Sequence, residues 1–119
     1  MFVAKYPDFL AQIAFKDGTY VYFDGVKDMF KYYFDLSKFQ SDKNISDIDS
    51  IYVTDYYDLV PIDGFKAYYV TGSDVYGPMG RELIPHQTED DAGTFLADHK
   101  GEALWKFEEI TPELIKSLD

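Results

Sequence analysis

Two segments near the start of the chain have the hydrophobic pattern of β-strands. Residues 10–15 are a short, mainly apolar, strand-like run, and residues 19–23 are rich in aromatic and β-branched side chains. Asp17 and Gly18 stand between them, and glycine tolerates the positive φ that a two-residue hairpin turn requires. The pattern therefore predicts an antiparallel hairpin with Asp17-Gly18 at its tip.

A helical pattern follows this hairpin. Asp24 belongs to the residue types that cap a helix N-terminus. Apolar side chains behind it recur at the i, i+3, i+4, i+7 and i+8 spacing of one helix face, namely Val26, Met29, Phe30, Tyr33 and Phe34. The polar residues 37–46 predict a loop, and alternation within residues 49–57 predicts a third strand. Residues 9–57 thus form a first predicted ββαβ unit.

The same order of elements recurs in residues 65–109. Residues 67–70 have strand character, residues 72–80 form a loop with three glycines and a proline, and residues 82–84 suit a second, short strand. The next apolar helix face consists of Ala92, Phe95, Leu96 and His99. Residues 103–107 complete the second ββαβ unit as its closing strand.

Capping residues mark the later helices. Thr88 with Asp91 resembles a capping box, and Gly101 suits the C′ position after a helix. Near the C-terminus, Thr111 is an N-cap type and is followed by a proline, which is favoured in a first helical turn. These residues predict a short C-terminal helix over residues 111–118.

The repeated order predicts an α+β fold of two pseudo-symmetric ββαβ units packed together. A chain of 119 residues has the size of one compact domain, so we expect residues 1–119 to form a single domain. The chain contains no cysteine, which excludes disulfides within it. Its aromatic content of 18% predicts that Tyr and Phe rings supply much of the core.

The charge of the chain excludes one class of partner. A formal net charge of −11 repels phosphate backbones, so nucleic-acid binding is not expected. No apolar run approaches the roughly 20 residues that span a membrane. Residues 1–6 lack the basic and apolar regions of a signal peptide. We therefore expect either a cytosolic protein or the mature or truncated form of an exported one.

Few residues have the pattern of a catalytic site. The chain has two histidines, His86 and His99, and its serines stand in no Gly-x-Ser-x-Gly elbow. Its glycines match neither a P-loop nor a dinucleotide motif. Acidic pairs such as Asp55 and Asp58 lack the spacing of a calcium loop and predict a solvated acidic segment. The sequence does not predict an enzyme.

Soft-metal binding is the remaining kind of chemistry. Copper(I) prefers polarizable sulfur, and a thioether binds it without losing a proton. Met79 stands between a proline and a glycine, which restrict the backbone and leave space around the sulfur; a loop methionine folded onto the core is the alternative. Met29 is expected in the core. His86 is a second candidate donor, whereas His99, on an apolar helix face, is more typical of a packed histidine.

Long blocks of the sequence stand in a specific order. The longest is YYVTGSDVYGPMG at residues 68–80, followed by ELIP at residues 82–85. Others are FDGVKDMF at residues 23–30, VTDYY at residues 53–57 and DHKG at residues 98–101. With these blocks the chain resembles the NosL family, the copper chaperone lipoproteins of nitrous oxide reductase assembly in denitrification. The family fold, two ββαβ halves distantly similar to organomercurial lyase, agrees with the order of elements above.

The resemblance implies a set of copper ligands. The family has a Cys-Gly-Met motif directly before a segment like FVAKYP at residues 2–7, so Met1 matches the methionine and the cysteine would precede it. It implies copper(I) held by that cysteine and by methionine sulfur, with Met1 and Met79 as the candidates in this chain. His86 and His99 are further, weaker candidates. Many family members have histidine where this chain has Arg81.

The resemblance also implies a function. It implies a non-enzymatic chaperone that delivers copper(I) to nitrous oxide reductase through a membrane transporter accessory complex. The full-length form would be extracytoplasmic, either periplasmic or held at the membrane by a lipid anchor. The alternative is a NosL-like interaction module without metal binding, which docks to the transporter or the reductase assembly through acidic charge and exposed tyrosines.

Overall fold

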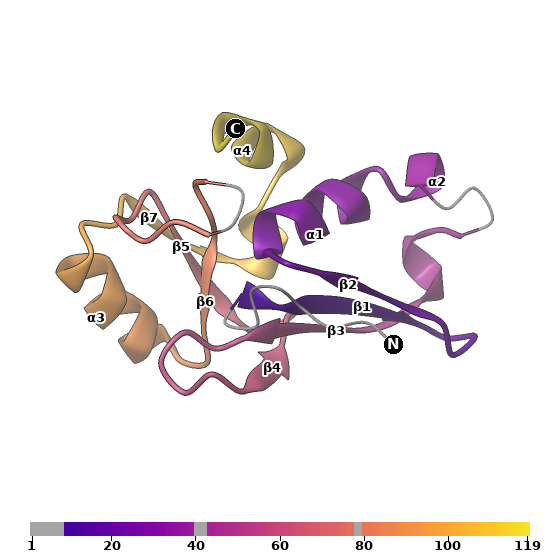
Figure 1. Ribbon diagram of the computed structural model, residues 1–119, viewed down its shortest axis with the longest axis horizontal. Coiled ribbons are helices and arrows are strands. Elements are labelled where there is room, and N and C mark those ends of the chain that lie inside the picture. Colours follow the sequence, from indigo (N-terminus) through magenta and orange to yellow (C-terminus); the bar gives the residue numbers. More distant parts are fainter. Residues whose placement is uncertain (1–8, 40–42, 78–79) are drawn as a thin grey trace.

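The computed structural model describes residues 9–39, 43–77 and 80–119. Within these ranges the chain forms two antiparallel sheets with helices packed against them (Figure 1). The strands are β1 (Ala11–Phe15), β2 (Tyr20–Phe23), β3 (Ile48–Thr54), β4 (Pro61–Asp63), β5 (Tyr68–Thr71), β6 (Ile84–His86) and β7 (Ala103–Lys106). The helices are α1 (Val26–Phe34), α2 (Leu36–Phe39), α3 (Glu89–Asp98) and α4 (Pro112–Ser117), with short 3₁₀ turns η2 (Ile45–Asp47) and η3 (Phe107–Glu109).

The order of elements repeats. The first sheet has the strand order β2-β1-β3-β4 and the second has β6-β5-β7, so β1-β2-α1-β3 and β5-β6-α3-β7 have the same arrangement. The predicted α+β fold of two ββαβ units is therefore confirmed. No helix in the described part of the chain is long and apolar enough to cross a membrane.

Several predicted boundaries were wrong. Residues 37–46 were predicted as a loop, yet α2 and η2 both fall within or beside that stretch. The strand β4 was not predicted; it extends the first sheet by pairing Ile62 with Val53. The predicted strand at residues 82–84 lies two residues later, at β6. The N–H of Leu83, just before this strand, donates to the Glu82 carboxyl group at 3.1 Å.

The hairpin between β1 and β2 has a three-residue loop instead of the predicted two-residue turn. Phe15 still pairs with Thr19, since its N–H donates to the Thr19 carbonyl at 2.7 Å. The N–H of Gly18 donates to the Phe15 carbonyl at 3.0 Å, and Gly18 has a φ of 91°. This is a turn followed by a left-handed glycine, the usual form of three-residue hairpin loops.

The N-cap of α1 is Gly25, not the predicted Asp24, and it makes no side-chain capping bond. A distant side chain supplies the missing acceptor, because the N–H of Lys27 in the first turn donates to Glu82 Oε1 at 2.5 Å. Behind this start, the predicted apolar face packs inward, with Met29 and Phe30 fully buried.

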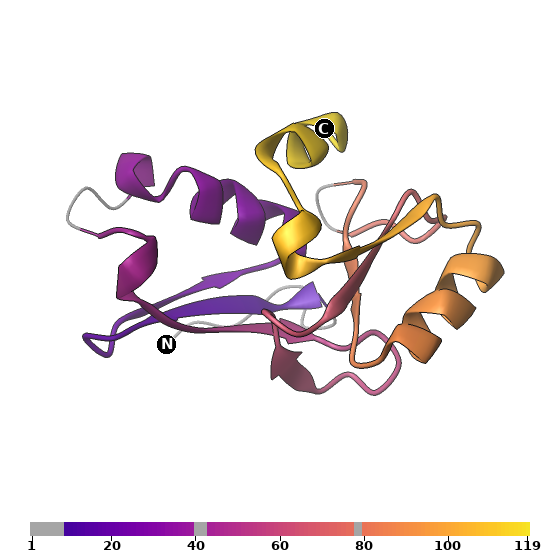
Figure 2. The same cartoon turned by 180° about the vertical axis from the view of Figure 1, so that it is seen from behind.

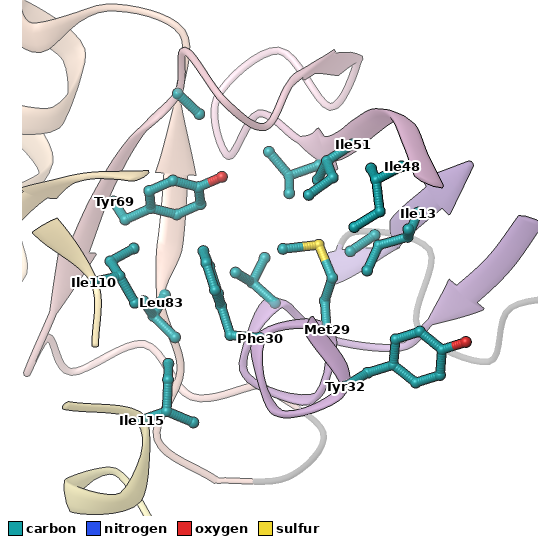
Figure 3. Close-up of a cluster of buried hydrophobic side chains, with 14 of the residues drawn as sticks. Ile13, Met29, Phe30, Tyr32, Ile48, Ile51, Tyr69, Leu83, Ile110 and Ile115 are labelled. Atoms are coloured by element: carbon teal, nitrogen blue, oxygen red, sulfur yellow. The ribbon is translucent and has the colours of Figure 1, made fainter. Parts of the chain in front are cut away.

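One buried cluster joins the two sheets. Figure 3 shows Met29 and Phe30 of α1 between side chains of the first sheet, such as Ile13, and side chains of the second sheet region, such as Tyr69 and Leu83. Ile110, just before α4, and Ile115, within α4, belong to the same cluster. A second cluster joins α3 to the second sheet and consists of Val70, Ile84, Ala92 and Phe95. Consecutive residues of β5 thus face two different clusters, and Figure 2 shows that strand between α3 and the first unit.

The ends of the later helices fit the predicted capping residues in part. Thr111 caps α4 through a bond from the Leu114 N–H, as predicted. Thr88 caps α3 through the Asp91 N–H at 3.1 Å. The predicted C′ position of Gly101 was wrong by one residue, because Lys100 has the left-handed φ of 58° after α3.

Candidate metal site

The segment with the predicted soft-metal ligand connects β5 to β6. Gly72 and Gly80 have φ values of 76° and 92°, which L side chains rarely adopt. Gly77 and Gly80 pair with each other: the Gly77 N–H donates to the Gly80 carbonyl at 2.9 Å, and the reverse bond is 3.2 Å. We call the described residues of this segment, 72–77 and 80, the glycine loop. Its two paired glycines flank Pro78 and Met79 in the sequence.

Both methionines predicted as copper ligands, Met79 and Met1, lie outside the described residues. Their roles therefore stay predictions. Among residues 9–39, 43–77 and 80–119, no three His, Asp or Glu side chains gather in a group that could hold a metal ion. Met29 is fully buried in the core, as the helical pattern predicted.

His86, the first candidate nitrogen donor, is fully buried on β6. Its ring packs against the rings of Phe95, Tyr56 and Tyr57, with centroid distances of 4.8, 6.1 and 5.4 Å. Neither ring nitrogen has a hydrogen-bond partner among the side chains and backbone that the structure describes. Burial lowers the pKa of His86 to about 4, so the ring is neutral at physiological pH. Its position gives a metal ion no direct access from the surface.

His99, the second candidate, caps the C-terminus of α3 and is partly exposed. Its Nδ1 lies 2.9 Å from Asp74 Oδ1 in the glycine loop, and its ring stacks on Phe95 with a centroid distance of 4.4 Å. A backbone hydrogen bond joins the same two residues, since the Asp74 N–H donates to the His99 carbonyl at 2.9 Å. The packed histidine expected from the helical pattern fits this geometry, and its main contact is to the glycine loop.

The structure brings the two histidines to the same aromatic cluster. Both rings contact Phe95, and both lie about equally far from Tyr56, at 6.1 and 6.0 Å. The sequence placed His86 and His99 on different elements and did not indicate this neighbourhood. His86 is enclosed, and His99 Nδ1 is engaged by a carboxylate. Among the ring nitrogens of the two histidines, only Nε2 of His99 therefore remains available to a metal ion.

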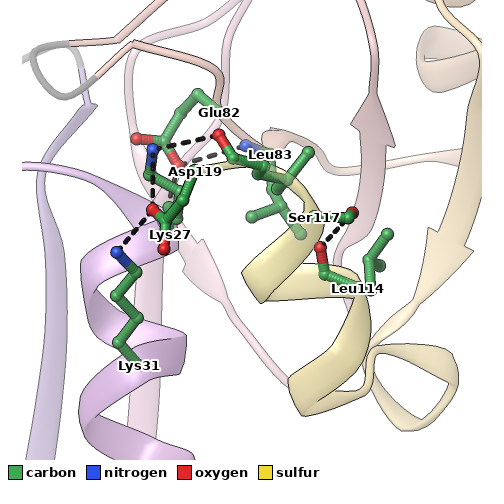
Figure 4. Close-up of polar contacts among 8 residues, drawn as sticks. Lys27, Lys31, Glu82, Leu83, Leu114, Ser117 and Asp119 are labelled. Atoms are coloured by element: carbon green, nitrogen blue, oxygen red, sulfur yellow. Dashed lines mark hydrogen bonds and ion pairs between the residues drawn. The ribbon is translucent and has the colours of Figure 1, made fainter.

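Glu82 is a residue of this region that sequence reasoning missed. The residue was predicted as part of a strand, yet its side chain is buried at the base of the glycine loop, with 2% of its surface exposed. Figure 4 shows it between Lys27 of α1 and Leu83, the two residues whose N–H groups it accepts. A glutamate directly before the apolar residues Leu83 and Ile84, and shortly after a glycine-rich segment, was the available signal in the sequence.

The carboxyl group of Glu82 occupies an unusual environment. A small cavity of about 100 Å³ beside it is lined by Gly72, Ser73, Tyr76, Arg81, Glu82 and Glu102. Burial raises the pKa of Glu82 to about 7, although the Leu83 and Lys27 N–H groups and the Lys27 charge oppose the shift. At neutral pH the group is therefore divided between its protonated and ionised forms.

A second acidic residue was also mispredicted. Asp55 was expected in a solvated acidic segment, but it is fully buried between β3 and β6. Its two carboxyl oxygens accept the N–H groups of Asp58 at 2.7 Å and of Gln87 at 2.8 Å. Asp55 therefore joins the two sheets and is not a free metal ligand.

Comparison with known proteins relates the chain to a protein family and to solved structures. The NosL family model matches residues 1–115. The chain is similar to the crystal structure of the copper chaperone NosL from Shewanella denitrificans, with a TM-score of 0.73 and 23% identity; the match covers 87% of this chain and 79% of that one. At this identity the likeness supports the fold alone.

The second structure is the solution NMR structure of the apo-NosL protein from Achromobacter cycloclastes. The chain matches it with a TM-score of 0.60 and 27% identity, over 88% of this chain and 87% of that one. No match was found among curated protein sequences. Two structures solved by different methods thus have the arrangement of sheets and helices seen here.

Proposed function

The chain belongs to the NosL family, and from this premise we propose that it is a copper(I) chaperone that delivers copper for the maturation of nitrous oxide reductase. The observation that carries the proposal is the family match over residues 1–115, which includes Met1, Met79 and the whole glycine loop. A solved structure with the same fold is described as a copper chaperone. Copper is the cargo of such a protein and not a resident cofactor.

The chemistry of the candidate ligands supports copper(I) in particular. Met1 and Met79 offer thioether sulfur, which suits this soft ion and needs no deprotonation. The proposed site is completed by a cysteine thiolate that precedes Met1 in the full-length protein. Two thioethers and one thiolate leave copper able to pass to the next sulfur or nitrogen ligand, as a carrier requires.

A carrier role also fits the rest of the proposed setting. We propose a non-enzymatic, extracytoplasmic protein with a lipid anchor in its full-length form, working with the membrane transporter accessory complex of the reductase. A net charge of −11 suits contact with a basic docking face and opposes binding to nucleic acid. The membrane would be reached only through the lipid anchor.

The test is a copper(I) competition against a chromogenic chelator. The protein carries an added Cys-Gly pair ahead of Met1, and Met79 is replaced by leucine. Loss of one sulfur ligand should weaken copper(I) binding by about tenfold, which corresponds to about 1.4 kcal/mol. Met29→Leu is the matched control, because Met29 is fully buried and a leucine of similar volume is tolerated there.

Equal affinities of the Met79→Leu variant and its parent would remove Met79 from the site. Failure of the parent itself to compete with the chelator would reject copper(I) binding as the function. The same titration with Met1→Leu measures the second thioether independently.

The alternative function is a docking module that does not bind metal. Exposed tyrosines favour it, since Tyr20, Tyr52, Tyr57 and Tyr76 each expose more than two fifths of their surface. Under this alternative, replacing these tyrosines would abolish binding to the transporter complex, while changes at Met79 would leave that binding intact. Pull-down with both sets of variants separates the two functions.

A further inference from the structure

The side chain of Glu82 connects two parts of the molecule that are distant in the sequence. Its Oε1 accepts the N–H of Lys27, 55 residues away at the start of α1, and the N–H of its own neighbour Leu83. The amino end of a helix favours negative charge, because its first N–H groups have no partner within the helix. Glu82 thus fills the capping position that Asp24 and Gly25 leave open.

The second oxygen of this carboxyl group points into a space bounded by glycines. Oε2 has no hydrogen-bond partner in the described part of the chain. A Cβ atom added to Gly25 would collide with Oε2, and one added to Gly77 would lie 2.9 Å from it. The two glycines therefore allow the carboxyl group to lie between the β2–α1 connection and the glycine loop.

The charged groups around Glu82 come from several elements. Lys27 and Asp28 of α1 act on it electrostatically with opposite signs. Arg81 and Glu102 line the same cavity. The Lys27 ammonium itself is directed to the C-terminus, 3.5 Å from the Leu118 carbonyl and 3.7 Å from Asp119 Oδ1, as Figure 4 shows. The backbone N–H of Lys27 therefore binds Glu82, and its ammonium group binds the end of the chain.

We propose that Glu82 is a positioning residue: its buried carboxyl group joins the glycine loop to the amino end of α1, and copper(I) affinity depends on that junction. The copper part of this inference rests on the proposed function. An ionised Oε2 requires a hydrogen-bond donor, whereas a protonated Oε2 requires a hydrogen-bond acceptor. The two forms therefore favour different arrangements of the backbone at Gly25 and Gly77. Because burial raises the pKa of Glu82 to about 7, this exchange falls at neutral pH.

The first experiment needs no metal. Amide chemical shifts of Lys27, Gly77 and Gly80 are followed by ¹⁵N NMR while the pH is varied across neutrality. The junction predicts a common inflection near pH 7 for amides on both sides of the carboxyl group. In Glu82→Gln, which keeps an acceptor oxygen but cannot ionise, that inflection disappears. Absence of the inflection in the parent protein would overturn the proposal.

The second experiment measures copper(I) affinity in the protein extended by Cys-Gly. Substitution of residues that hold metal ligands in place typically weakens binding by about 10- to 100-fold, and we expect a loss in this range for Glu82→Gln. The pH profile of the affinity should also lose its inflection near neutrality. Glu102→Gln is the matched control, because Glu102 lines the same cavity but is exposed.

A second variant approaches the junction from the side of α1. Gly25→Ala keeps an extended backbone that any residue adopts, with φ of −155°, yet its Cβ displaces the Glu82 carboxyl group. It should reproduce the loss of copper(I) affinity although no residue of the glycine loop is substituted. It carries the test if Glu82→Gln does not fold.

The outcomes separate the positioning role from the proposed function. If the parent protein binds copper(I) and both variants match its affinity and pH profile, the positioning role is rejected and the copper function stands. If the parent does not bind copper(I), the proposed function is rejected, and the metal-free amide titration still decides whether Glu82 joins the loop to α1.

Discussion

At the scale of single residues, the burial of His86 makes the stability of this protein depend on pH. The pKa of His86 is lowered from its ordinary 6.5 to about 4, because burial disfavours the charged ring. As the pH falls below 6.5, the unfolded chain binds a proton at this histidine while the folded chain does not. Stability contributed by His86 is therefore complete above pH 6.5 and is lost as the pH falls to about 4.

His86→Phe should remove this acid sensitivity, because phenylalanine retains the ring contacts and cannot be protonated. Between neutrality and pH 4, the parent's free energy of unfolding should fall by up to about 3 kcal/mol more than that of the variant. Urea denaturation at a series of pH values measures the difference. The comparison uses the change in the free energy of unfolding with pH and not its absolute value, because the larger ring can itself lower stability. Parallel slopes for the two proteins would contradict the assignment.

The residue scale is also where prediction from the sequence was weakest. Glu82 and Asp55 were read as strand and solvated-loop residues, and both are buried carboxylates. Each group accepts one N–H from a distant element: Lys27 lies 55 residues from Glu82, and Gln87 lies 32 residues from Asp55. No local pattern encodes a partner at that distance, so only the assembled fold reveals such groups.

At the scale of elements, the end of α3 illustrates what local patterns predict and where they fail. The C-terminal signal of this helix was recognised, but Lys100 and not Gly101 adopts the left-handed conformation. Gly101 follows it, and its N–H donates to the Leu96 carbonyl at 2.8 Å. A Cβ at Gly101 would lie 2.7 Å from Val70 Cγ1, so packing against β5 requires glycine at this position. Capping chemistry was predictable, whereas its register depended on tertiary packing.

This arrangement predicts opposite effects for two neighbouring substitutions. Gly101→Ala should destabilise the protein by about 1–3 kcal/mol, because the added methyl group overlaps Val70 and Leu96. Lys100→Gly should stabilise it by up to about 1 kcal/mol, because glycine avoids the steric cost of the left-handed conformation. Chemical denaturation of both variants gives the two values. The reverse order would show that Gly101 itself is the conformational cap.

At the scale of the whole molecule, the repeated ββαβ order was predictable because hydrophobic periodicity survives errors at single boundaries. The packing of one sheet against the other was not predictable, since it depends on which faces of β5 and α1 meet. Tyr69 illustrates this: the strand pattern identified its element, but not that its hydroxyl donates to the Gly64 carbonyl at 2.6 Å within the shared cluster.

The shared cluster predicts that the two units unfold together, as one domain. Met29 belongs to the first unit, and the single tryptophan, Trp105, reports on the second sheet, where its Nε1 donates to Thr71 Oγ1. Met29→Ala leaves a cavity at a fully buried site and should lower the free energy of unfolding by about 2–5 kcal/mol. The decrease in the free energy of unfolding should be the same when unfolding is followed by tryptophan fluorescence and by far-ultraviolet circular dichroism, although the substitution lies in the other unit.

Ile45→Ala is the control for this comparison, because Ile45 is 52% exposed and its truncation should change stability by less than about 0.5 kcal/mol. Two separable transitions in Met29→Ala, with fluorescence unchanged, would mean that each unit is stable alone. Coincident transitions are expected because Phe30 of α1 contacts Tyr69 of β5 directly, with ring centroids 5.6 Å apart. Removing the neighbouring Met29 loosens that contact, so the second sheet loses its support together with the first.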